Sequence, residues 1–172
     1  KSQKGQNSRK AFLLANSKII CAEEFAFYNC RSLVELEGIT ISKIRGSAFE
    51  NCCNLKRIEI TELNEIGRRA FRNCSKLEYL GKRLGQRNQV AKRSIIFLQN
   101  ELASPLGIKI GERAFENCTV ITKVKIHSKC AISRRAFGKC SALRCAEFNG
   151  DIEYEGPIFR GCTNLTEIKL GV

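Results

Sequence analysis

The most constraining feature of this 172-residue chain is a five-residue signature that returns at a fixed interval. It reads alanine, phenylalanine, two variable residues and cysteine, and its copies begin at Ala26, Ala48, Ala70, Ala114 and Ala136. A variant starts at Ile158 and ends at Cys162, and successive copies start 22, 22, 44, 22 and 22 residues apart. A fixed period of this length is typical of a solenoid, in which each repeat forms one coil.

Apolar residues also recur at fixed distances from each signature. Three residues after the cysteine stand Leu33, Leu55, Leu77, Ile121, Leu143 and Leu165. Three residues further on come Leu36, Ile58, Leu80, Val124, Ala146 and Ile168, and two beyond these come Gly38, Ile60, Lys82, Ile126, Phe148 and Leu170. Four residues before the alanine, or its equivalent, stand Ile44, Ile66, Ile110, Ile132 and Tyr154. The last part of the pattern alternates with period two and predicts a short strand in each coil.

A single coil buries little surface, so the coils have to stack in order to form a core. We expect like residues to lie over like, about 4.8 Å apart, with the strands pairing in parallel. The phenylalanines then form a continuous aromatic column, and the alanines occupy positions too crowded for a larger side chain.

The segment from Ile110 to Cys118 reads I-G-x-x-A-F-x-x-C and, with the L-x-x-L-x-L spacing after it, resembles the BspA-like leucine-rich repeats. The resemblance covers about residues 22–80 and 106–172. It implies an α/β, right-handed and curved leucine-rich-repeat solenoid with short parallel strands. We expect residues 1–172 to form one such domain of about seven 22-residue coils. The resemblance also implies adhesion or protein binding, and no shared catalytic residues.

One coil, at about residues 81–105, keeps the length of the repeat but not its signature. Positions 92 and 93 carry Lys92 and Arg93 where the pattern has alanine and phenylalanine, and Ile96 stands at the cysteine position. Leu102 still falls in the strand position, but the spacing of Ala91, Ile95, Leu98 and Leu102 predicts a short amphipathic helix.

The degenerate coil is also strongly basic. Its start holds no acidic residue and carries the basic patch Lys82, Arg83, Arg87, Lys92 and Arg93. Such a patch attracts an anionic surface; the alternative is a tolerated irregular coil whose charges are only solvated. At the N-terminus, residues 1–10 are polar and basic, and we expect them to be extended.

Six of the ten cysteines lie in the signature column, where free thiols act as small buried groups. The remaining four, Cys21, Cys53, Cys130 and Cys145, lie at other phases of the repeat. No C-x-x-C motif occurs, and His127 is interpreted as a turn residue, so we expect no metal and no cofactor. The many free thiols favour a reducing intracellular compartment, whereas the family resemblance favours the cell surface. Localisation therefore stays open.

The residues that flank the central strand position point away from the core and form the expected concave, partner-binding face. They are Glu35, Glu37, Arg57, Glu59, Tyr79, Lys123, Lys125, Glu147, Glu167 and Lys169, with Glu101 and Ala103 in the degenerate coil. These residues differ from coil to coil. Such variation is expected of a protein-binding surface, and it is also expected of surface positions that are under no constraint.

Function is constrained by charge and by missing motifs. Thirty Lys and Arg against 17 Asp and Glu give a net charge of +13, which favours acidic partners. We expect a non-enzymatic scaffold that binds another protein, such as an acidic protein, or belongs to a multi-subunit complex. The alternative is RNA or DNA backbone binding along a ridge formed by Arg68, Arg69, Arg113, Arg134 and Arg135.

The sequence contains no membrane-spanning run, no phosphate-binding glycine loop and no nucleophile–base pattern that would indicate a small-molecule substrate. The apolar last strand leads us to expect that further repeats or a partner cover that end.

Overall fold

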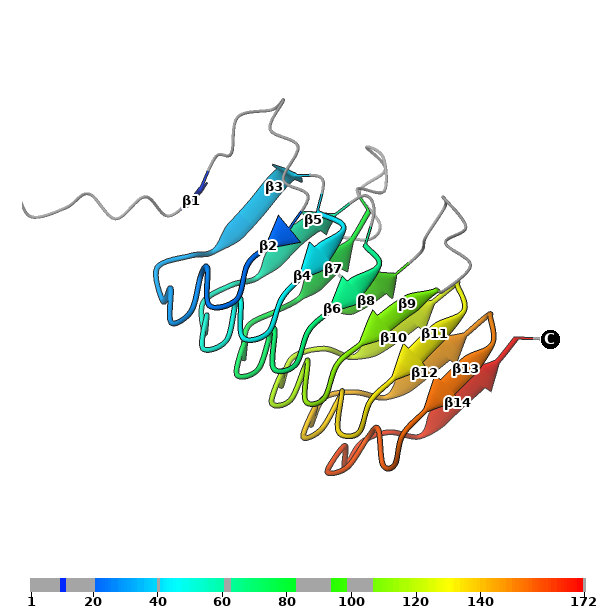
Figure 1. Ribbon diagram of the computed structural model, residues 1–172. Coiled ribbons are helices and arrows are strands. Elements are labelled where there is room, and N and C mark those ends of the chain that lie inside the picture. The colour runs from blue at the N-terminus through cyan, green and yellow to red at the C-terminus, as the bar shows by residue number, and fades with distance from the viewer. Residues whose placement is uncertain are drawn as a thin grey trace, which may run out of the picture.

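The computed structural model describes residues 10–11, 21–39, 41–60, 63–82, 94–98 and 107–171. These residues form a solenoid of parallel strands and tight turns, and they contain no helix. The strands lie in two sheets that face each other across one core (Figure 1). The predicted leucine-rich-repeat solenoid with short parallel strands is therefore confirmed.

Within the described residues, one sheet has eight strands and the other has six. The eight-stranded sheet runs β1 (Lys10–Ala11), β3 (Glu35–Ile39), β5 (Arg57–Ile60), β7 (Tyr79–Gly81), β8 (Ile95–Leu98), β10 (Lys123–Ile126), β12 (Cys145–Phe148) and β14 (Glu167–Leu170). The six-stranded sheet runs β2 (Cys21–Ala22), β4 (Lys43–Ile44), β6 (Glu65–Ile66), β9 (Ile108–Ile110), β11 (Cys130–Ile132) and β13 (Ile152–Tyr154). In each coil the signature forms the turn that leads from the six-stranded sheet to the eight-stranded one.

The strand register places like residues over like, as the repeat predicts. Ile58 pairs with Leu80 in one sheet, and Ile132 pairs with Tyr154 in the other, both at an offset of one period. The first coil differs from the prediction. The register shifts after Leu36, so that Ile39, and not Gly38, pairs with Ile60. A bulge adds one residue to β3 and brings a β-branched residue into the position where the fixed spacing placed a glycine.

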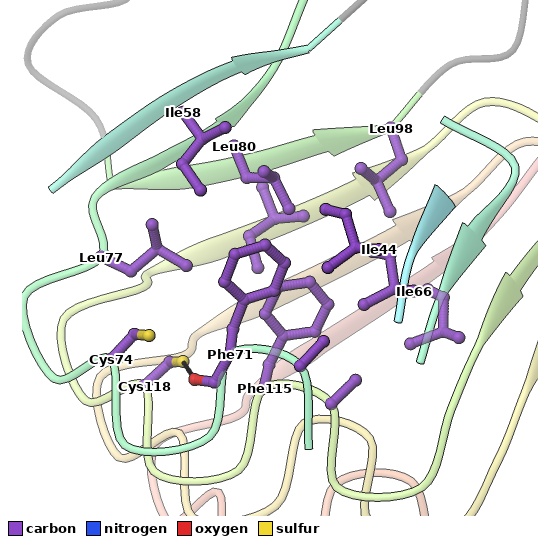
Figure 2. Packing of buried hydrophobic residues seen from close by; sticks show 14 of the residues in the cluster. Ile44, Ile58, Ile66, Phe71, Cys74, Leu77, Leu80, Leu98, Phe115 and Cys118 are labelled. Atoms are coloured by element: carbon purple, nitrogen blue, oxygen red, sulfur yellow. Dashed lines mark hydrogen bonds between the residues drawn. The ribbon is translucent and has the colours of Figure 1, made fainter. Parts of the chain in front are cut away.

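The aromatic column forms the centre of the core. The rings of Phe27, Phe49, Phe71, Phe115, Phe137 and Phe159 stack with successive centroid distances of 4.9, 5.2, 5.3, 5.1 and 5.8 Å. The four middle rings are fully buried. Figure 2 shows Phe71 over Phe115, with Leu80 on one side and Ile66 on the other. Because each coil that carries the signature contributes one ring, the column ties these coils together.

Among the described residues, the degenerate coil contributes a strand to only one sheet. In the six-stranded sheet β6 pairs directly with β9, so that Ile66 lies beside Ile110. In the eight-stranded sheet β8 is inserted between β7 and β10, and Ile96 lies between Leu80 and Val124. The coil therefore lengthens one side of the solenoid by a strand, while the aromatic column passes over it from Phe71 to Phe115.

The details predicted for this coil were wrong where the structure describes it. Ile96 holds the core strand position between Leu80 and Val124, so it does not replace the ladder cysteine. Leu102, which the fixed count placed at the strand position, lies outside the described residues. Ile95 and Leu98, which belong to the predicted helical spacing, lie in strand β8. The four residues of β8 are all apolar, and a short apolar run has no periodicity that separates helix from strand. Without β8, the facing edges of β7 and β10 would have unpaired backbone groups, so a strand is favoured between them. Residues 83–93 and 99–106 lie outside the described residues.

Candidate protein-binding face

The outward face of the eight-stranded sheet is built by the alternation of its strands. In β5, Ile58 and Ile60 are buried in the core, while Arg57 and Glu59 lie on the other side of the sheet and remain partly exposed. The same alternation in β10 sends Lys123 and Lys125 outward. The structure therefore places the predicted face residues of these strands in adjacent columns, at matched register.

The centre of this face is apolar and was only partly predicted. Strand β8 contributes Ile95 and Phe97 at the positions where the sequence pattern placed Glu101 and Ala103. Ile95 lies beside Tyr79, and the guanidinium of Arg57 lies 5.3 Å from the centroid of the Tyr79 ring. Tyr79 also donates a hydrogen bond from its hydroxyl to the backbone carbonyl of Lys82. A fixed 22-residue count missed β8 because this strand lies six residues before its expected place.

Basic and acidic groups converge next to this apolar centre. The ammonium groups of Lys123 and Lys125 each lie 3.1 Å from Oε2 of Glu147, and Nε2 of His127 lies 3.6 Å from Oε1. The His127 ring also packs edge-on against Phe97, with 5.1 Å between centroids. Thus His127 lies on the face as part of this cluster.

As a consequence, the carboxyl group of Glu147 has a lowered pKa and stays ionised in acidic solution. Its side chain is only 15% exposed, and burial by itself raises the carboxyl pKa. Hydrogen bonds from Lys123 and Lys125, with the charges of both, outweigh that effect and lower the pKa to about 2. Glu147 therefore neutralises part of the positive charge that the sequence assigned to the late coils.

At its two ends the face is more exposed. Glu37 is exposed and Glu35 is partly buried in β3. In β14 Lys169 and Glu167 form an ion pair of 3.1 Å with both side chains about half exposed. Of the predicted basic patch, Lys82 is described, whereas Arg83, Arg87, Lys92 and Arg93 lie outside the described residues.

The predicted basic ridge on the signature turns is paired only in part. Arg68, Arg113 and Arg134 share the carboxylate of Glu112, whereas Arg69 and Arg135 form no ion pair within the described residues. Glu112 lies between Arg68 and Arg134, with N–O distances of 3.5 and 3.1 Å. These two guanidinium groups hold the pKa of Glu112 below its usual value, although burial opposes this effect. A second ladder joins Glu50, Arg72 and Glu116, at 3.2 and 3.0 Å. The charged residues of each ladder are separated by multiples of 22 residues. The sequence therefore contains a signal from which these ion pairs could have been predicted.

The cysteine column links neighbouring coils by hydrogen bonds. The thiols of Cys52, Cys74, Cys118, Cys140 and Cys162 each lie 2.9–3.2 Å from a phenylalanine carbonyl oxygen in the adjacent coil. Figure 2 shows this bond from Cys118 to Phe71. Burial raises the pKa of Cys52 to about 12 and raises that of Cys118 further. All ten cysteines are free, so the column stabilises the stack without disulfides.

No metal site is formed by the described residues, in which no three His, Cys, Asp or Glu side chains gather as ligands. The same part of the chain has no helix long and apolar enough to cross a membrane.

With this geometry established, comparison with known proteins gives the family. A model of the BspA type leucine rich repeat region matches residues 7–82 and 97–171, with six copies. The chain belongs to the BspA-type leucine-rich-repeat family. The match skips the middle of the degenerate coil, where the signature is lost. BspA-type repeats form solenoids that are typically non-enzymatic and are associated with protein interaction.

A solved structure supports the fold assignment for this BspA-type chain. The crystal structure of a T. pallidum leucine rich repeat protein aligns with a TM-score of 0.57 and 22% sequence identity. The alignment covers 95% of this chain and 70% of the other. At this identity the similarity shows a shared fold. No curated protein matches the chain.

Proposed function

We propose that the chain is a non-enzymatic scaffold that binds another protein through the outward face of the eight-stranded sheet. The observation that carries the proposal is the layout of this face. Tyr79, Ile95 and Phe97 form an apolar centre, with Arg57 and Glu59 on one side and the Glu147 cluster on the other. Phe97 is partly exposed, whereas Tyr79 and Ile95 are 5% and 8% exposed. An apolar centre inside a polar rim is the usual anatomy of a protein–protein interface.

The charges of this face favour a protein over a phosphate backbone. Lys123 and Lys125 both contact Glu147, and Arg57 lies 3.8 Å from Glu59. A nucleic acid needs cations that are available to its phosphates. Paired charges held on a rigid sheet instead give a fixed pattern of both signs, to which a protein surface can be complementary.

Nucleic-acid binding is the second candidate, and it rests on the net charge of +13 and on the basic segment of the degenerate coil. The two candidates differ in their response to salt. Binding through several phosphates weakens steeply as salt rises, because condensed counterions are released on binding. A protein interface with an apolar centre is less sensitive to salt.

The test is to immobilise the full chain and recover bound proteins from a nuclease-treated extract of the native source, at low and moderate salt. Phe97→Ala and Lys125→Ala are compared with Lys109→Ala, which removes an exposed lysine from the six-stranded sheet. We expect a defined set of proteins that both face variants lose and the control retains. Loss of all bound proteins on nuclease treatment, or equal capture by all three variants, contradicts the proposal.

A further inference from the structure

The signature turns hold a hollow near the C-terminal end of the solenoid, on a different surface from the proposed protein-binding face. Its lining residues belong to the signature turns, which run along the lower side of Figure 1. The hollow has a volume of about 380 Å³. Its lining residues are Arg72, Arg113, Glu116, Arg135, Lys139, Arg160 and Gly161. Five cationic side chains and one carboxylate thus surround it, a net formal charge of 5 − 1 = +4.

The hollow lies beside the end of the ion-pair ladder of the signature turns. Two residues after the signature alanine, successive coils carry Glu50, Arg72, Glu116, Gly138 and Arg160. The first three form the ion-pair ladder described above. The ladder stops at Glu116 because Gly138 has no side chain to continue it. The next side chain in this column is Arg160, which lines the hollow together with Glu116.

The positive charge of the hollow is only partly neutralised within the described part of the chain, where Glu50 pairs with Arg72 and Glu112 with Arg113. Glu116, its one carboxylate, is already engaged by Arg72 at 3.0 Å. Arg135, Lys139 and Arg160 have no ion-pair partner among the described residues. Burying or crowding like charges costs free energy unless an opposite charge offsets it. An anion in the hollow provides that opposite charge.

The Arg113 guanidinium is only partly satisfied by the groups around it. Its Nε–H is buried and has no hydrogen-bond partner among the described residues, with Oε1 of Glu112 at 3.5 Å as an ion-pair contact. Buried donors in folded proteins almost always have an acceptor. Glu112 therefore satisfies Arg113 only in part, and the Arg113 side chain also lines the hollow.

The backbone N–H groups of these turns are not available to bind an anion, so only side chains can contact it. Arg113, Arg135 and Lys139 all have a φ of 56°, a conformation that in other proteins forms anion-binding turns from consecutive N–H groups. Here those N–H groups already donate to the next coil, from Arg135 to the carbonyl of Pro157 and from Lys139 to that of Arg160. An anion must therefore be bound by guanidinium and ammonium groups, whose geometry suits phosphate and sulfate oxygens.

We propose that this hollow binds a phosphate or sulfate monoester, with Arg113, Arg135, Lys139 and Arg160 contacting the oxyanion. The charge of the site matches a tetrahedral oxyanion. Its volume lies within the range of small-ligand sites, about 300–1,000 Å³, and exceeds that of one inorganic ion, since a water molecule occupies about 30 Å³. The remaining space accommodates the organic part of an ester.

The test is calorimetric titration of the full chain at low salt with phenyl phosphate, phenyl sulfate and uncharged phenol. We expect one saturable site for at least one of the two anions and none for phenol. Arg160→Gln and Lys139→Gln, both at exposed positions, should each weaken binding about tenfold. Arg144→Gln removes the same charge at an exposed position outside the hollow and should leave the affinity unchanged.

The pH dependence identifies the anion. A phosphate monoester gains its second charge near pH 6, so phenyl phosphate should bind more tightly at pH 7.5 than at pH 5, whereas phenyl sulfate should bind equally at both. Thermal unfolding of each variant verifies that it is folded. The proposal is overturned if neither anion saturates a site, or if Arg144→Gln weakens binding as much as the two hollow variants do.

Discussion

Phe115→Ala is the substitution whose effect the structure specifies best. The Phe115 side chain is fully buried, and its ring stacks between Phe71 at 5.3 Å and Phe137 at 5.1 Å. It also spans the point where the degenerate coil is skipped, so that it connects the coils before and after residues 83–106. Removing this ring therefore breaks two contacts in the column and leaves a cavity at that junction.

The expected cost in the free energy of unfolding is large. Truncating a buried phenylalanine to alanine costs about 3–5 kcal/mol, and loss of two stacked neighbours places Phe115 in the upper part of that range. Phe159, at the end of the column, is the matched comparison. It is only partly buried and has one column neighbour, Phe137 at 5.8 Å, so Phe159→Ala should cost about 1–2 kcal/mol.

Urea unfolding followed by circular dichroism measures both variants, with Phe115→Leu as a control that keeps most of the buried volume. In a solenoid each coil contacts only its neighbours, so weakening the junction should also reduce cooperativity. We expect Phe115→Ala to unfold in a broader transition than the wild type. A cost for Phe159→Ala equal to or above that for Phe115→Ala would refute the reasoning, because the stacked column would then not be what joins the coils.

Three further predictions concern thiols, close backbone contacts and pH. Iodoacetamide at pH 8 should modify the partly exposed Cys53 of the native protein and leave the buried Cys118 unmodified until the chain unfolds. Mass spectrometry identifies the labelled cysteines. Rapid labelling of Cys118 in the native state would contradict its burial. Gly111→Ala should destabilise the chain by about 1–3 kcal/mol in urea unfolding, since an added Cβ lies 2.7 Å from backbone atoms of the neighbouring coil, whereas Gly46→Ala, whose closest contact is 3.4 Å, should be tolerated. Glu147→Gln should destabilise the protein at neutral pH, because the pKa of Glu147 is lowered in the folded state. The stability that the ionised carboxylate contributes is fully present above about pH 4.5 and is lost as the pH falls through about 2. A difference in unfolding free energy between wild type and variant that stays constant down to pH 2 would exclude this role.

Most of the architecture was determined by the sequence alone. The 22-residue return of alanine, phenylalanine and cysteine predicted the stacked coils, the phenylalanine column and the free-thiol column, and all three are confirmed. These features depend on identical residues meeting at a fixed offset, so a period read from the chain is enough to predict them. The outward positions of the regular strands followed from the same period.

Only the tertiary structure decided the features that depart from the period. Strand β8 forms where β7 and β10 need a partner, which moves the core position to Ile96 and brings Phe97 onto the proposed binding face. The carboxylate of Glu147, and not the count of lysines, sets the charge of that face. Likewise, the hollow forms only because cationic side chains from several coils surround the same space. A repeat pattern specifies which residues stack, but the partners of an irregular strand or an unpaired charge are chosen by the assembled fold.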